Sequence, residues 1–200
     1  MSPEAEGEAL GGGTGAGAGR RREAEGPGRP TLTDVQAVIE SARTRGGEES
    51  LERYIQRRLP EAEEAELREA ASVAEEIVDS IPVFLARAHQ EADERGLRSV
   101  VDPLLDLAER YFLQPMDLIP EMTQGMPGLL DDAYLVIRIL QNLDNGPEPF
   151  LDWDLDDPAR FLRTLVGEGV GQRLDAIADD AMEQVSEHLQ ELFAHLSHPA

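Results

Sequence analysis

From Thr31 onward, apolar residues recur every three or four positions along this chain, and proline, glycine and aspartate interrupt the recurrence. That spacing is the repeat of one helix face, whereas a half-buried strand would alternate at every second residue. No alternating stretch of useful length is present. The pattern therefore predicts an all-α fold, an irregular bundle of roughly six to eight helices in a single domain over residues 31–200.

The breaks between apolar stretches predict where helices begin and end. Thr33 or Asp34 begins a short helix that ends before Gly46, and Ser50 is placed to cap the next one. A longer helix follows, and Pro82 should kink or restart it because proline lacks the N–H that the helix needs.

Glycine and two Asp-Pro pairs mark further boundaries. Gly96 should end the long helix, since glycine suits the position just past a helix. In Asp102-Pro103 and in Asp157-Pro158, the aspartate can accept N–H groups of a first turn and the proline occupies a position that needs no donor. We therefore expect one helix to begin at each pair.

The last predicted helix, residues 172–196, is amphipathic. Its apolar residues lie alternately four and three positions apart, the spacing of a seam for a partner helix in this chain or in another: Ala178, Met182, Val185, Leu189, Leu192 and Leu196. His188, Glu191 and His195 share one face and are residue types that bind zinc. The two histidines are two turns apart, about 10.5 Å by helix rise, so we interpret them as flanking residues of the seam.

The N-terminal tail, residues 1–30, has the composition of a disordered segment. It contains nine of the 18 glycines and almost no large apolar residue, so it cannot offset the entropy of its own ordering. Glu4, Glu6 and Glu8 stand where a signal peptide would need positive charge. We expect a tail without secondary structure and no export by a signal peptide.

The charge of the chain restricts its partners. A formal net charge of -23, from 41 acidic and 18 basic residues, repels the phosphates of nucleic acids and the anionic surface of a bilayer. No run approaches the ~20 apolar residues of a transmembrane helix, and no cysteine is present to form a disulfide or a thiolate site. These observations argue against nucleic-acid binding and an integral membrane span, and they favour a cytoplasmic location, with peripheral membrane contact as the alternative.

The stretch YFLQPMDLIPEMTQGMPGLLDD, residues 111–132, is the most specific in the chain. It reads as the end of one helix, an irregular turn that starts at Gln114, and a second helix over residues 129–143. That second helix is so apolar that it should lie at the centre of the bundle. Asp131 and Asp132 fall in its first turn, where each favours the positive end of the helix dipole by ~0.3–1 kcal/mol.

This order of residues resembles the signature of the YkvA-like family, a bacterial and archaeal group known only as a domain of unknown function. The resemblance covers residues 97–143 and implies a fold unit, a central helix-turn-helix, but no established activity or cofactor. Glu121 stands where the family usually has aspartate, and the spacer MTQGMP is longer and more polar. The residues that carry the match, and the candidate interaction site, are Tyr111, Pro115, Asp117, Leu118, Ile119, Pro120, Glu121, Gly128, Asp131 and Asp132.

Two acidic segments could be taken for cation sites. Asp117, Glu121, Asp131 and Asp132 carry the oxygen ligands that Mg²⁺ and Ca²⁺ prefer, but each also fits a local role as a cap or dipole partner, which we favour. The acidic loop, residues 144–157, has aspartates at the first three ligand positions of an EF-hand, but Asp157 and Arg163 replace its glycine and its bidentate glutamate. Its apolar residues instead make a docking segment or attach the loop to the core: Phe150, Leu151, Trp153 and Leu155.

No grouping of nucleophile and base, phosphate loop or nucleotide fingerprint occurs in the sequence. We therefore expect a non-catalytic helical interaction or adaptor protein with an unidentified protein partner and no cofactor. Two alternatives stay open: a peripheral membrane-associated protein, and a metal-dependent hydrolase or lyase that uses the acids of residues 117–132.

Overall fold

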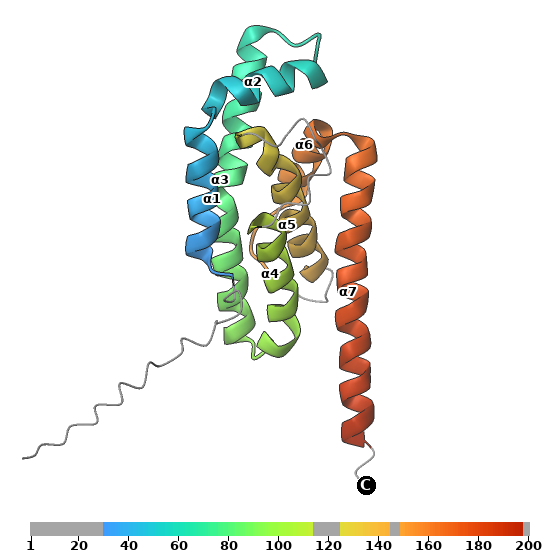
Figure 1. Ribbon diagram of the computed structural model, residues 1–200. Helices are drawn as coiled ribbons and strands as arrows, with labels where there is room; N and C mark the ends of the chain where they lie inside the picture. Colours follow the sequence, from blue (N-terminus) through green and yellow to red (C-terminus); the bar gives the residue numbers. More distant parts are fainter. Residues whose placement is uncertain (1–29, 114–124, 145–148, 198–200) are drawn as a thin grey trace, which may run out of the picture.

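The computed structural model describes residues 30–113, 125–144 and 149–197, with only the backbone at 47–48, 188–189 and 191–197. The predicted tail, residues 1–30, falls outside them except for Pro30. The described residues contain no strand, which confirms the all-α prediction (Figure 1). Their elements are α1 (Leu32–Thr44), α2 (Gly47–Arg58), α3 (Glu64–Glu94), α4 (Arg98–Leu113), the 3₁₀ helix η2 (Met126–Leu129), α5 (Leu130–Leu143), α6 (Asp156–Val166) and α7 (Glu168–Ser197).

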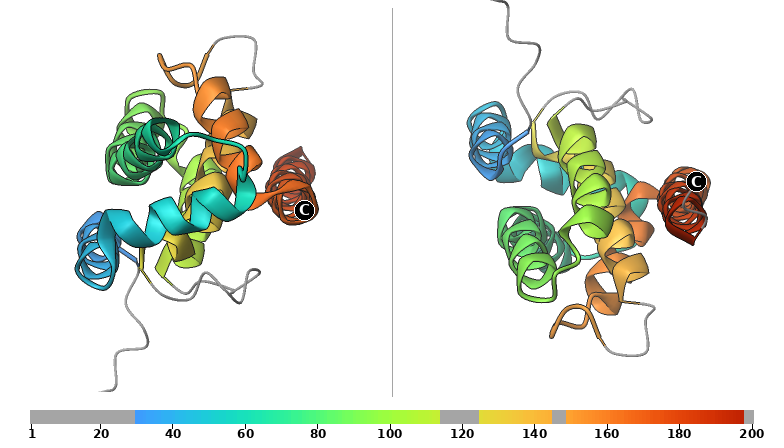
Figure 2. Two further views of the ribbon diagram at one scale, coloured as in Figure 1. Left: turned by 90° about the horizontal axis from the view of Figure 1, so that it is seen from above. Right: turned by 90° about the horizontal axis from the view of Figure 1, so that it is seen from below.

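Helix α5 is the centre of the bundle, as its apolar sequence predicted. It packs against α3, α4, α6 and α7, while α7 stands on the side away from α1 and α3 (Figure 2). Every residue of α5 from Leu130 to Ile137 is buried, and so are Ile139 and Leu140. Burying one such aliphatic side chain contributes about 1.5–3 kcal/mol, so this helix supplies a large share of the core.

The first two helices begin where capping groups are available. Thr31 and Asp34 form a reciprocal capping box for α1: the Thr31 N–H donates to the Asp34 carboxylate (3.0 Å), and the Asp34 N–H donates to Thr31 Oγ1 (3.3 Å). The predicted start at Thr33 or Asp34 was thus slightly late. Ser50 does not cap α2, because α2 begins after Gly46 and Ser50 lies inside its first turn.

Helix α3 does not restart at Pro82. It runs unbroken for 31 residues with Pro82 buried inside it. An internal proline costs about 3 kcal/mol, and here the burial of Val78, Ile81 and Leu85 around it offsets that cost. The predicted end at Gly96 is confirmed: Gly96 has φ +68°, and the Leu97 N–H returns to the carbonyl of Ala92 (2.7 Å).

The two Asp-Pro pairs behave differently. The prediction that α4 begins at Asp102-Pro103 was wrong, because α4 already begins at Arg98 and Pro103 is its sixth residue. Helix α6 begins at Asp156, one residue before the predicted pair, so Pro158 lies in a first turn that needs no donor there. Asp154, and not Asp157, accepts the N–H of Asp156 (2.9 Å).

Helix α7 is longer than predicted and extends past the lower end of the bundle (Figure 1). Its first half packs on α4, α5 and α6, and Ala178, Met182 and Val185 contact the core. The partner of this half of the predicted seam is therefore intramolecular. The rest of the seam, and the set that could have bound zinc, lie where the side chains are not described: His188, Leu189, Glu191, Leu192, His195 and Leu196.

The described part of the acidic loop is attached to the core. The Asp144 carboxylate accepts the N–H groups of Phe150 and Leu151, and the Trp153 ring lies 5.1 Å from that of Phe84, centroid to centroid. The EF-hand-like aspartates turn to separate partners: Asp152 to Arg87, Asp154 to the backbone of α6, and Asp156 to Gln141. This part of the loop serves attachment. Among the helices described, none has a stretch long and apolar enough to cross a bilayer.

Candidate binding site at the junction of α5, α6 and α7

The motif residues divide between the described and undescribed parts of the chain. Tyr111 lies half-buried near the end of α4, and Gly128 lies half-buried in η2. Asp131 and Asp132 occupy the first turn of α5, where the sequence placed them, and only 5% and 4% of their surfaces are exposed. The other members lie outside the described residues: Pro115, Asp117, Leu118, Ile119, Pro120 and Glu121.

The burial of Asp131 and Asp132 limits what the pair can do. Both make polar interactions within the molecule, and they present almost no surface to a partner protein. Capping, which the sequence favoured, and cation binding both stay predictions, since Asp117 and Glu121, the other two acids of the set, lie outside the described residues. The described residues hold no group of three or more metal-ligating side chains.

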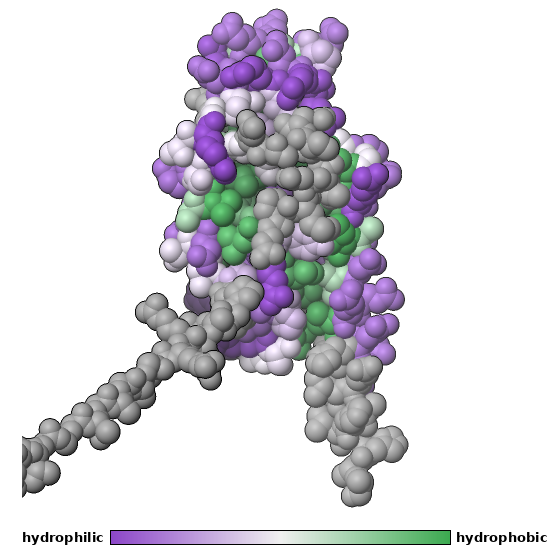
Figure 3. Space-filling view, in the orientation of Figure 1, coloured by the Kyte–Doolittle hydropathy of each residue, from purple (hydrophilic) through white to green (hydrophobic). Residues whose placement is uncertain are grey.

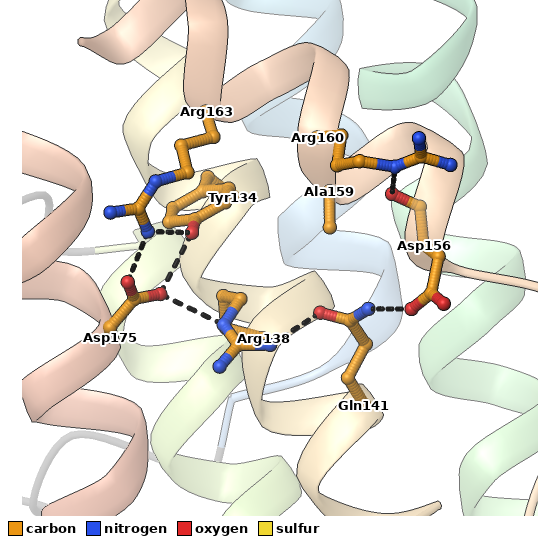
Figure 4. Close-up of a pocket in the computed structure, with 8 residues that line it drawn as sticks. All are labelled: Tyr134, Arg138, Gln141, Asp156, Ala159, Arg160, Arg163 and Asp175. Atoms are coloured by element: carbon orange, nitrogen blue, oxygen red, sulfur yellow. Dashed lines mark hydrogen bonds and ion pairs between the residues drawn. The ribbon is translucent and has the colours of Figure 1, made fainter. Parts of the chain in front are cut away.

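A polar cluster that the sequence did not predict lies at the junction of α5, α6 and α7 (Figure 4). We call it the Asp175 cluster: Tyr134 and Arg138 from α5, Arg163 from α6 and Asp175 from α7. The Tyr134 hydroxyl donates to Asp175 Oδ1 (2.8 Å), and Arg138 Nε donates to the same oxygen (2.9 Å). Arg163 Nη1 donates to Asp175 Oδ2 and to the Tyr134 oxygen (3.0 Å).

Each arginine also donates to an acceptor outside the cluster. Arg138 Nη1 donates to the Gln141 amide oxygen (2.7 Å), and the Gln141 amide donates to Asp156 (2.6 Å). Arg163 Nη2 donates to Glu168 (3.0 Å). The cluster borders a pocket of about 320 Å³, whose lining residues are Tyr134, Arg138, Gln141, Asp156, Ala159, Arg160, Arg163 and Asp175. The arginines therefore hold three helices together at the wall of an open pocket.

The contacts of the cluster shift the pKa values of Asp175, Tyr134 and Arg163 away from neutrality. Burial alone would raise the pKa of Asp175, but the hydrogen bonds from Arg163 and Tyr134 outweigh it and lower that pKa. Burial, and then the hydrogen bond to Asp175, raise the pKa of Tyr134. The hydrogen bonds to Asp175 and Glu168 raise the pKa of Arg163. Asp175 is therefore ionised, Arg163 charged and Tyr134 neutral throughout the physiological range.

A second group of charged side chains, the His89 cluster, joins α3 to α4. His89 Nε2 lies 2.9 Å from Glu109 Oε1, and its Nδ1 lies 3.4 Å from Asp102. The hydrogen bond with Glu109 raises the pKa of His89 against the opposing effect of burial. Glu109 is only 2% exposed, while the side chains of His89 and Asp102 are 23% and 20% exposed. The cluster ties the two helices together.

One sequence signal could have indicated the Asp175 cluster. Arg138 is the single charged residue after Asp132 in the apolar stretch 129–143. A cation in such a helix requires a carboxylate from a neighbouring element. Its partner Asp175 is 37 residues away in sequence, so only the packing of α7 on α5 identifies the pair.

No protein-family model matches the chain, and searches of curated proteins and of solved structures find no match either.

Proposed function

We propose that the protein is a non-catalytic helical interaction protein, an adaptor that acts in the cytoplasm by binding another protein. The observation that carries the proposal is the charge state of the Asp175 cluster. A general acid or base works best with a pKa near the operating pH. The pKa values of Asp175, Tyr134 and Arg163 are all displaced away from it, so these groups supply fixed charges and hydrogen bonds for positioning.

The charge of the chain supports a basic protein as the partner. With a net charge of -23, the molecule attracts cationic surfaces at long range and repels nucleic acid. Such steering raises the rate of association and suppresses acidic partners. The proposal includes membership of the 97–143 unit in the YkvA-like family, which rests on the motif alone and brings no activity with it.

The test has an interaction arm and a catalytic arm. The tagged chain is crosslinked in its host cells, captured proteins are identified by mass spectrometry, and each candidate is then mixed as purified protein with purified chain. A complex of fixed stoichiometry in sedimentation would support the proposal. In parallel, the purified chain is incubated with host small-molecule extract. Saturable, time-dependent consumption of any compound would overturn it, as would the failure of every candidate to form a complex.

A further inference from the structure

An apolar groove opens between α4 and α7 in the described part of the chain. It has a volume of about 250 Å³, and its lining residues are Ser99, Pro103, Leu104 and Leu107 from α4 with Ala181, Gln184 and Val185 from α7. Leu104 and Ala181 are buried, while Leu107 and Val185 are half-buried. Green, hydrophobic surface runs down between α4 and α7 beside the purple side chains of α7 (Figure 3).

The chain's own helices leave this groove open. Helices α4 and α7 run in opposite directions, and α7 continues past the start of α4 (Figure 1). The Asp175 cluster fixes α7 against α5 and α6, so α7 is held in place by polar contacts on another side. The small residue Ala181 and the ring of Pro103 then leave space that larger side chains would fill.

The dimensions and the charge of the groove select its occupant. Ligand pockets for small molecules usually measure about 300–1,000 Å³, so a groove of about 250 Å³ suits the protruding side chains of a helix. Two exposed acids of α7 stand next to lining residues in the sequence: Asp180 precedes Ala181, and Glu187 follows Val185 by two residues. On α4, Asp102 and Asp106 line a neighbouring hollow that shares Ser99 and Pro103 with the groove. Arg98 also lines this hollow and lies 3.8 Å from Asp102.

We infer that the α4–α7 groove binds an amphipathic helix of a partner protein, with aliphatic side chains on its buried face and lysine or arginine beside them. The inference rests on the proposed function and names its surface and partner class. A second copy of the chain fits less well, because each copy carries a net charge of -23. The acids near the groove would then repel the acidic surface of the second copy. A basic helix meets those acids with the opposite charge.

The probe is a synthetic helical peptide with leucines on one face and lysines on the other, and a control peptide replaces the leucines with alanine. Binding to the full chain is measured by fluorescence anisotropy. Leu107→Ala removes apolar contact area from the groove, and Leu107→Glu also adds an acid. The matched control is Val83→Glu, which adds the same charge at an exposed valine of α3 outside the groove.

We expect the leucine peptide to bind the wild type and Val83→Glu alike. Leu107→Glu should weaken binding about tenfold or more, which corresponds to the loss of one buried leucine contact. Leu107→Ala should weaken it in the same direction, and circular dichroism should show that all variants are folded. An added acid strengthens purely electrostatic binding to a lysine peptide, so Leu107→Glu binding as tightly as the wild type would overturn the inference.

Three further outcomes would also overturn it. Sedimentation that shows a dimer of the wild type and a monomer of Leu107→Glu would assign the groove to a second copy. Peptide binding that appears only after residues 1–29 are deleted would assign it to the chain's own tail. If a captured partner forms a complex that Leu107→Glu does not weaken, this inference fails while the proposed function stands.

Discussion

The Asp175 cluster and the His89 cluster perform the same structural task with different chemistry. Each joins separate helices through charged hydrogen bonds: α5, α6 and α7 in one case, α3 and α4 in the other. The first uses two arginines as cations, whereas the second uses an imidazole. An arginine keeps its charge at every accessible pH, while a histidine loses it near neutrality. The two junctions should therefore differ in how pH affects their strength.

The sign of each effect follows from the pKa shifts. The folded-state pKa of Asp175 is lowered, so its contribution to the free energy of unfolding is present above the unfolded value, about 3.9, and is lost as pH falls through the folded value. The folded-state pKa of His89 is raised. Its contribution is complete below the unfolded value, about 6.5, and is lost as pH rises through the folded value.

The largest effect should come from Asp175→Ala. This change leaves Arg138 and Arg163, each about a quarter to a third exposed, without the carboxylate between them. Breaking a fully buried pair costs about 3–5 kcal/mol, so partial exposure suggests a loss of about 2–3 kcal/mol in urea unfolding. Asp180→Ala, at an exposed position of the same helix, should change stability by less than about 0.5 kcal/mol.

The deficit of Asp175→Ala should also be constant between pH 6 and pH 9, because the pKa of Asp175 is lowered and that of Arg163 is raised, both away from that range. If the deficit shrinks as pH rises, the stability contributed by the Asp175 cluster depends on pH as that of the His89 cluster does, and the proposed difference between them is wrong.

Glu109→Gln should give the second largest effect, and a different pH dependence. Glu109 is the main partner of His89, with Asp102 on the other ring nitrogen and Arg98 beyond it. Losing a charged hydrogen bond costs about 1.5–3 kcal/mol. The deficit should be largest below about pH 6.5 and should shrink as His89 loses its proton at higher pH.

The measurement is the free energy of unfolding of both proteins from pH 5 to pH 9. Glu76→Gln, an exposed substitution on α3, is the matched control and should show no such trend. A Glu109→Gln deficit that does not vary with pH would mean that His89 stays neutral in the folded protein.

Replacing Asp131 and Asp132 together should give a third, smaller loss of stability. The same variant distinguishes capping by this pair from cation binding. Changing both to asparagine keeps side-chain acceptors but removes the favourable charge at the start of α5, for a loss of about 1–2 kcal/mol in total. Added Mg²⁺ or Ca²⁺ should leave the unfolding midpoint of the wild type unchanged. If the unfolding midpoint of the wild type rises with the concentration of either ion, and that of the double variant does not, the pair binds a cation and the capping interpretation is wrong.

How far the sequence predicts this molecule depends on the range of each interaction. The core face of α5 follows from local spacing, and Val136, Ile137 and Leu140 are buried as expected. The prediction that α4 begins at Asp102-Pro103 was wrong because the preference of proline for a first turn is weaker than the burial gained when α4 begins earlier, at Arg98. That extension buries Val101 and partly buries Val100.

The Asp175 cluster could not be predicted in the same way. Tyr134 and Arg138 share a helix face by spacing, but their acceptor depends on the register of α7 against α5. That register is set by apolar packing around Ala178 and Leu174 on α7, which no spacing within either helix reveals. A charged residue in an apolar helix predicts that a partner exists, and only the tertiary fold identifies it.

Tyr134→Phe tests the cluster with the smallest change. It removes the hydroxyl that donates to Asp175 and accepts from Arg163, and it keeps the buried ring in place. Both arginines still contact Asp175, so the charges stay paired and the loss should be about 1 kcal/mol, the net value of a typical hydrogen bond. In a double-mutant cycle with Asp175→Ala, the two losses should not add, because the hydroxyl has lost its acceptor once the carboxylate is gone. Additive losses in urea unfolding would show that Tyr134 acts apart from Asp175, and the junction would then consist of the two arginine pairs alone.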